Sequence, residues 1–220
     1  MRVHHWLMVG LVATSAIVYT GNVSAQDIQI RYSTLYGKLK QNVKEGHDDV
    51  KMAFFLLNQK DGSVCKVHRG WMQKDEHYEA LVIPSSYELD VPVDKNLRQA
   101  NPDVTFVIDD GITCDMSMQV IAKDRFSTTM TQADVTRLVP QMQSLLSDLG
   151  GMFSDWFMPE VSGVVVHLAE QPLDFVPLAN GQRIPVNEKK AVIKLSDLAI
   201  DEQITFPSKI VKVTPWLPRD

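Results

Sequence analysis

The sequence predicts a β-rich α+β fold. We expect an antiparallel sheet or sandwich with a short N-terminal helix, a longer helix near residues 132–149, and then a small C-terminal β unit. Three observations predict this fold. Apolar and polar residues alternate in short runs between residues 28 and 120, as in strands with one buried face. The apolar period becomes helical after Thr131, and strand-like runs resume at Val161.

Residues 1–25 have the three parts of a cleavable secretory signal peptide. Arg2 gives a positive start, residues 7–19 are almost entirely apolar or small, and Ala25 ends a polar, turn-prone segment. The apolar run is shorter than the roughly 20 residues of a membrane-spanning helix. We therefore expect the working chain to start near Gln26, to keep no membrane span, and to be periplasmic or secreted.

The first elements after that segment are a short strand and a short helix. Ile28, Ile30 and Tyr32 alternate with polar residues, which predicts the strand. Ser33 can cap a helix that presents Leu35 and later apolar residues on one face.

Residues 50–120 favour strands, and two turns predict hairpins. The run 52–57 is apolar throughout, as in a strand covered on both faces. Asp61-Gly62 predicts a hairpin that returns through residues 64–72. Residues 109–111 predict a second hairpin that returns through residues 112–120.

Cys65 and Cys114 are the two cysteines of the chain. In an oxidising compartment such a pair predicts a structural disulfide, while buried thiols or a redox pair are the alternatives. In the second hairpin, Cys114, Met116 and Met118 share a strand face that we expect to be inward. Cys65 shares the inward face of its own strand with Trp71, so the bridge would tie two hairpins together.

The longer helix starts with a capping box formed by Thr131 and Asp134. Its apolar face holds Val135, Leu138, Val139, Met142, Leu145, Leu146 and Leu149. Beyond it we expect strands at 161–168 and 191–195, and a hairpin turn at Asn180-Gly181.

This order suggests an N-terminal α+β unit over residues 26–121, a helical connector over 122–160, and a small β unit over 161–220. One domain over residues 26–220, with a helix laid across its sheet, is the alternative. About 195 residues are enough to bury a core in either arrangement.

The charge balance disfavours nucleic acid as a partner. Removing residues 1–25 removes only Arg2, which lowers the net charge from −5 to −6. Such a chain is repelled on average by phosphate backbones and anionic lipid.

Four short runs carry a resemblance to a known family. They are residues 31–40, 45–50, 180–186 and 213–218, the last reading Val-Thr-Pro-Trp-Leu-Pro. Together they resemble an uncharacterised family of exported gammaproteobacterial proteins, a domain of unknown function. The resemblance implies an envelope location in a gram-negative cell, and it implies no catalytic residue, ligand or cofactor.

The pattern of reactive residues predicts no catalytic, cofactor or metal site. His47, His68, His77 and His167 have neither helical zinc spacing nor Cys-x-x-Cys partners. Nucleophile elbows, phosphate loops and dinucleotide fingerprints are missing from the sequence.

Three tryptophans are the candidates for binding a partner or ligand. Trp71, Trp156 and Trp216 could stack on sugar rings or anchor a protein. For Trp71 we expect the core, for Trp156 an apolar cluster, and for Trp216 partial exposure.

These observations favour a non-catalytic periplasmic binding or accessory protein, whose partner is an envelope protein or a glycan. A hydrolase acting on cell-wall or glycan material is the alternative, served by His68 or His77 with carboxylates. Copper handling by Met116, Met118 and the two thiols is a further alternative, because soft ligands suit Cu(I).

Overall fold

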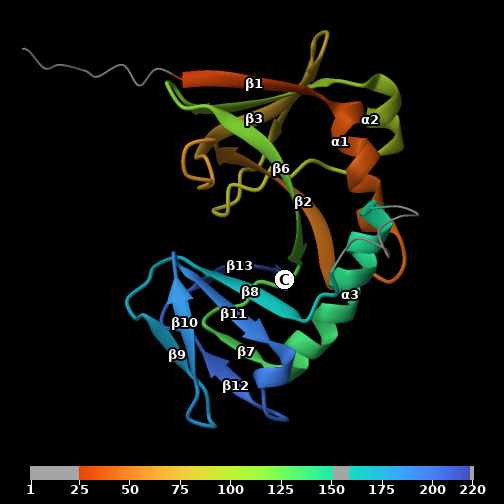
Figure 1. The fold of residues 1–220 in the computed structure, drawn as a ribbon. Helices are drawn as coiled ribbons and strands as arrows, with labels where there is room; N and C mark the ends of the chain where they lie inside the picture. The colour runs from red at the N-terminus through yellow and green to blue at the C-terminus, as the bar shows by residue number, and fades with distance from the viewer. Residues whose placement is uncertain (1–24, 151–158, 219–220) are drawn as a thin grey trace, which may run out of the picture.

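The computed structural model describes residues 25–150 and 159–218 (Figure 1). They form a four-stranded sheet, a five-stranded sheet and two two-stranded ribbons. Residues 1–24 of the expected signal peptide, and Trp156, lie outside the described residues. The predicted β-rich α+β class is confirmed, including the short first helix, the longer later helix and the C-terminal sheet.

The elements of the first half begin with the predicted strand and helix. In chain order they are β1 (Ala25–Arg31), α1 (Tyr32–Leu39), the 3₁₀ turn η1 (Lys40–Val43), β2 (Val50–Asn58), β3 (Val67–Lys74), β4 (His77–Leu81), α2 (Lys95–Ala100), β5 (Asp103–Asp109) and β6 (Cys114–Ala122).

The elements of the second half follow the same convention. They are β7 (Thr129–Thr131), α3 (Gln132–Gly150), β8 (Gly163–Leu168), β9 (Phe175–Pro177), β10 (Arg183–Asn187), β11 (Lys190–Lys194), the 3₁₀ turn η3 (Leu195–Asp197), β12 (Gln203–Thr205) and β13 (Ile210–Trp216).

The four-stranded sheet has the order β1-β5-β3-β4, and each neighbouring pair is antiparallel. Alternation along β5 sends Val104, Phe106 and Ile108 into the core, where all three are fully buried. Gly70 of β3 lies directly against Phe106, because a Cβ at this position would be 2.7 Å from Cδ1 of that ring. The inner face of the sheet is therefore closely packed.

Both predicted turns exist, but the first closes only a short antiparallel bridge between Leu57 and Val64, and the strands β5 and β6 on either side of the second do not pair. Asp61 accepts hydrogen bonds from the backbone and hydroxyl of Ser63, and Gly62 has a positive φ of 68°. However, β2 pairs with β6 along its whole length, while β3 pairs with β4 and β5. The reason is that β2 is apolar on both faces and needs cover on each, whereas β3 can leave one face to solvent.

The predicted disulfide joins Cys65 to Cys114. Cys114 opens β6 opposite Asn58, and the Cys65 N–H donates to the Leu56 carbonyl at 2.8 Å. The bridge therefore fastens the loop that follows β2 onto the start of β6. It ties one end of the β2–β6 ribbon, and not two hairpins.

The prediction that Met116 and Met118 point inward is wrong. Their exposed fractions are 41% and 50%. Residues 120–122 of β6 are buried, whereas the half of the strand nearer Cys114 is half-buried or exposed. Within the described ranges β6 has β2 as its one strand neighbour, so this half of β6 is an edge.

Helix α3 begins with the predicted capping box and packs beside both units (Figure 1). The Asp134 N–H donates to Thr131 Oγ1, and the Thr131 N–H donates to Asp134 Oδ2. Arg137 and Gln141 reach Asp49 before β2, each at 2.6 Å. The Gln141 hydrogen bond, followed by the Arg137 contact, lowers the pKa of the Asp49 carboxyl. In the part of the chain that the structure describes, no helix combines the length and apolarity needed to cross a membrane.

The C-terminal sheet has the order β13-β8-β11-β10-β9, and its neighbours are antiparallel. Asn180-Gly181 lies in the turn between β9 and β10, as predicted. The inner face of this sheet belongs to the same apolar cluster as Phe106 of the first sheet, through Val164, Val166 and Ile193. The core is thus continuous from one sheet to the other.

His167 lies on the other face of β8, between Lys190 of β11 and Lys212 of β13. Its Nε2 is 3.1 Å from Thr214 Oγ1. Burial, together with the charges of Lys212 and Lys190, lowers the pKa of His167 to about 3. Since the ordinary value is near 6.5, the unfolded chain takes up this proton first as the pH falls.

We predict that His167 makes the fold acid-sensitive between about pH 6 and pH 4. The wild type should lose at most about 1.4 kcal/mol of unfolding free energy per pH unit from this residue. A His167→Gln variant should lose that part of the slope and keep the part due to carboxylates. Urea unfolding at pH 7.0, 5.5 and 4.5 measures the difference, and equal slopes for the two proteins would contradict the prediction.

Candidate binding face on the four-stranded sheet

The outer face of the four-stranded sheet brings polar and aromatic residues into two rows. One row crosses the strands through Gln29, Thr105, Trp71 and Ala80. The adjacent row crosses through Arg31, Asp103, Gln73 and Tyr78. Because Val104 and Phe106 fill the inner face, Asp103 and Thr105 must lie on the outer one.

Trp71 lies on this outer face, so the prediction that it shares the inward strand face of Cys65 is wrong. The β3–β5 register shifts between Val67 and Arg69, which marks a β-bulge. The extra residue moves the alternation by one position, so that Val67, Gly70 and Met72 are buried while Trp71 is half-buried. A bulge adds no recognisable residue type, and the sequence pattern therefore could not reveal it.

Trp71 and Tyr78 form an aromatic pair on this face. Their rings are nearly parallel, with an interplanar angle of 28° and centroids 6.2 Å apart. Tyr78 is 61% exposed, and the guanidinium of Arg69 lies 5.5 Å from the Trp71 ring centroid. Exposure of a large aromatic pair on a regular strand face costs hydrophobic stabilisation, and such surfaces mark interaction sites.

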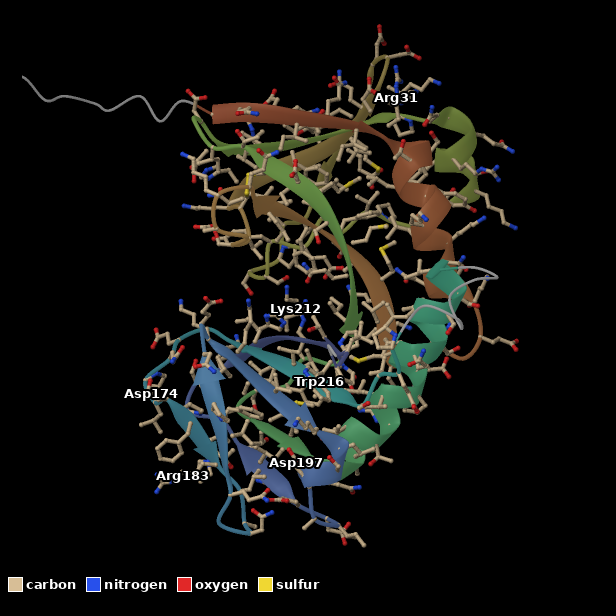
Figure 2. The ribbon with its side chains drawn as sticks, in the orientation of Figure 1. Arg31, Asp174, Arg183, Asp197, Lys212 and Trp216 are labelled. Atoms are coloured by element: carbon tan, nitrogen blue, oxygen red, sulfur yellow. A yellow bond between two sulfur atoms is a disulfide. The ribbon has the colours of Figure 1, made fainter. Side chains whose placement is uncertain are left out.

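A polar pocket of about 300 Å³ lies at the α2 end of the sheet. Two of its lining residues, Gln73 and Thr105, are the strand partners of Tyr78 and Trp71, so the pocket lies next to the aromatic pair. Arg31 Nη1 is 3.1 Å from Asp103 Oδ1 at its mouth, and Figure 2 labels Arg31 at the end of β1. Further lining residues are Gln29, Gln73, Lys74, Asp75, Asn101, Pro102 and Thr105. Thr105 is 7% exposed and lies deepest on the sheet.

The pocket combines neutral hydrogen-bonding groups with four charged side chains, those of Arg31, Asp103, Lys74 and Asp75. Amides and hydroxyls each offer both donors and acceptors, and the Arg31–Asp103 pair adds one fixed group of each kind. Beside it, the rings of Trp71 and Tyr78 offer apolar faces. This combination suits a ligand that carries many hydroxyls and flat C–H faces.

Sequence reasoning identified Trp71 as a candidate but missed Arg31, Asp103, Thr105 and Tyr78. These residues lie next to one another only because of the register in which the strands pair, and the sequence pattern does not show that register.

Neither His47 nor His68 has the partners of a serine-type catalytic relay. His47 is 1% exposed, with Ser144 Oγ at 3.4 Å and Asp148 Oδ2 at 3.5 Å. Both contacts are to the same nitrogen, Nε2, whereas a serine relay needs the nucleophile and the acid on opposite ring nitrogens. His68 Nε2 contacts Asp109 Oδ1 at 2.6 Å, away from the polar pocket.

The other candidates are spread over the molecule. Both cysteine sulfurs are in the disulfide, so the soft-metal hypothesis has only the thioethers of Met116 and Met118 to draw on. Groups of three or more histidine, cysteine or carboxylate side chains with metal-binding geometry were not found among the described residues. Trp216 lies on the C-terminal sheet and is half-buried.

The fold and this face define a class: β-rich, disulfide-bonded α+β proteins with an aromatic and polar surface on an open antiparallel sheet. The chain also matches the model of a known protein family. The model matches residues 24–168, and the chain belongs to the family described as Protein of unknown function (DUF2987). No curated protein and no solved structure matches the chain.

The matched segment contains the four-stranded sheet, the β2–β6 ribbon, α3 and β8. Two of the runs that carry the family resemblance, residues 31–40 and 45–50, lie inside it. The other two, residues 180–186 and 213–218, lie outside it. The candidate binding face is therefore wholly within the family segment.

Proposed function

We propose that this protein is an exported, non-catalytic binding protein of the gram-negative envelope, and that the outer face of the four-stranded sheet binds a glycan. The hydrophobic run at residues 7–19 and the family resemblance support export. The Cys65–Cys114 disulfide supports it independently, because disulfides persist in oxidising compartments. Intact mass of protein from separated periplasmic and cytoplasmic fractions tests export, and a chain that is found only in the cytoplasmic fraction with residues 1–25 retained would contradict it.

The observation that carries the glycan proposal is the aromatic pair beside the polar pocket. Sugar rings present C–H faces to aromatic rings and hydroxyls to polar side chains. Trp71 and Tyr78 supply the first surface, and Gln73 and Thr105 supply groups for the second. An apolar ligand would leave the pocket groups unpaired at a cost of about 1–3 kcal/mol each. The arrangement therefore favours a polar ligand with one flat apolar side.

A location in the envelope limits the candidate glycans to those of the cell wall. Oligomers of N-acetylglucosamine and soluble peptidoglycan fragments carry the required hydroxyls, amides and ring faces. The pocket of about 300 Å³ accommodates roughly one sugar unit, so the aromatic pair would carry the next.

We predict that Trp71→Ala weakens binding of these saccharides about tenfold or more, equivalent to about 1.4 kcal/mol. Isothermal titration calorimetry with chitin oligomers and with muropeptides measures the change. Gln73→Ala should weaken binding less, since it removes one hydrogen-bonding group and keeps the rings.

Trp216→Ala is the matched control, because it removes the same side chain from the other sheet. It should leave saccharide affinity unchanged. The proposal fails if the folded wild-type protein binds none of these saccharides, or if Trp71→Ala and Trp216→Ala bind them equally well.

A further inference from the structure

The outer face of the C-terminal sheet is a second open surface, and its residues also fall into rows. The middle row is apolar and crosses β10, β11 and β8 through Pro185, Val192 and Val165. Val165 and Val192 are both half-buried although they lie opposite the core. An exposed sheet face normally carries polar residues at these positions.

This apolar row is the floor of an open groove of about 700 Å³. Trp216, Pro215 and Leu217 form one end of it, at the C-terminal end of β13. The Nζ of Lys194 lies 5.2 Å from the Trp216 ring centroid and so covers part of the indole.

Cationic side chains border the apolar row on both sides. Lys190 and Lys212 lie in the row on one side of it, with His167 between them. Lys194 lies on the other side, and Arg183 lies on the same face at β10. Figure 2 labels Arg183, Lys212 and Trp216, which are spread over this sheet and not gathered at one point.

The charged residues at the strand positions of this face are cations, and of these Lys190 lines the groove itself. Glu188 is the carboxylate that lines the groove, 3.9 Å from Lys190 and with 87% of its side chain exposed. The Nζ of Lys212 donates to Gln119 Oε1 at 2.7 Å and lies 4.4 Å from the Phe55 ring centroid. Over residues 25–150 and 159–218, no carboxylate lies within ion-pair distance of Lys212. A basic surface on a chain of net charge −5 is a local feature and needs its own explanation.

We propose that this groove binds an extended acidic segment of a partner protein, with apolar side chains over Val165 and Val192 and carboxylates toward Lys190 and Lys194. The site is separate from the glycan face and does not depend on it. Successive same-side residues of an extended peptide are about 7 Å apart. Lys190 and Lys194 are four residues apart on β11, so they are about 13 Å apart and match carboxylates spaced along such a peptide.

The same spacing argues against a single compact anion. A phosphate or a lipid headgroup is held by cations that converge on one point, as in bidentate arginine sites. Here the cations line two sides of an open apolar surface. An acyl chain would need an enclosed cavity, whereas this groove opens to solvent along its length.

The test uses fluorescein-labelled decapeptides in which aspartate alternates with leucine or valine, titrated with full-length mature protein at two salt concentrations. We expect anisotropy to report binding that weakens as salt rises. A peptide with lysine in place of aspartate should not bind. The double variant Lys190→Glu/Lys194→Glu should bind the acidic peptide at least tenfold more weakly, and Trp216→Ala should weaken it as well.

Lys60→Glu/Lys66→Glu is the matched control, because it makes the same charge change at exposed lysines of the first unit. It should keep wild-type peptide affinity, as should Trp71→Ala, and thermal melting confirms that every variant folds. Three results would overturn the proposal: no binding of the acidic peptide, equal losses in the two double variants, or binding to anionic phosphatidylglycerol vesicles but not to peptide.

Discussion

Replacing Cys65 and Cys114 together by alanine is expected to lower the free energy of unfolding by about 4 kcal/mol. The two cysteines are 49 residues apart in the sequence. In the chain-entropy account, closing a loop of that length lowers the entropy of the unfolded ensemble and so raises its free energy by about this much. The loss is close to the whole stability of a marginal domain, which is about 5–15 kcal/mol. Urea unfolding of the variant against the oxidised wild type measures it.

The reduced wild type is the control for side-chain packing. Cys65 is 3% exposed and Cys114 is half-buried, so removal of either sulfur also removes contacts. Reducing the wild type with dithiothreitol breaks the bridge and keeps both sulfurs. Reduced wild type should therefore lose most of what the double variant loses, and an unchanged midpoint on reduction would show that the bridge contributes nothing.

Gly163→Ala is expected to destabilise the protein by about 3 kcal/mol or more. A Cβ on Gly163 would lie 2.2 Å from the Ile193 carbonyl oxygen and 2.9 Å from Lys194 Cα. Both are backbone atoms of β11, so no side-chain rotation relieves the overlap, and the strands must separate. Since β8 is bonded to both β11 and β13, the separation would disturb the centre of the C-terminal sheet.

Gly37→Ala adds the same methyl group, but we expect it to stabilise the protein. Gly37 lies inside α1, and a Cβ there would meet no atom within 4 Å. Alanine is the better helix former, so this variant should gain about 0.5–1 kcal/mol. Thermal and urea unfolding of the two variants side by side distinguish steric overlap from a general effect of added methyl groups. Equal effects of the two substitutions would contradict the steric explanation.

Local sequence signals predicted elements well and strand partners poorly. The Thr131–Asp134 box marks the start of α3, and Asn180-Gly181 marks a real hairpin, because both are decided by residues within four positions of each other. β2 pairs with β6 because both faces of β2 must be buried, and the segments that bury them are distant in the sequence. Turn chemistry at Asp61 could not reveal that choice.

The candidate site was predictable in part for the same reason. Trp71 stands out as a residue type, but its outward direction depends on the bulge between Val67 and Arg69. Arg31 and Asp103 meet only because β1 pairs with β5 in one register. The groove on the C-terminal sheet likewise needs the pairing of β11 with β8 before Val192 and Val165 become neighbours.

The pairing of β1 with β5 affects the order in which the molecule can form. Ala25 pairs with Asp109, and Arg31 pairs with Asp103, so the first strand emerges from the ribosome some 70–85 residues before its partner. At about 5–20 residues per second this delay is roughly 4–17 s. Such distant pairing also predicts slow folding, on the millisecond to second scale. β1 alternates its isoleucines with Gln29 and charged residues, so the strand that waits longest for its partner has little tendency to aggregate while it waits.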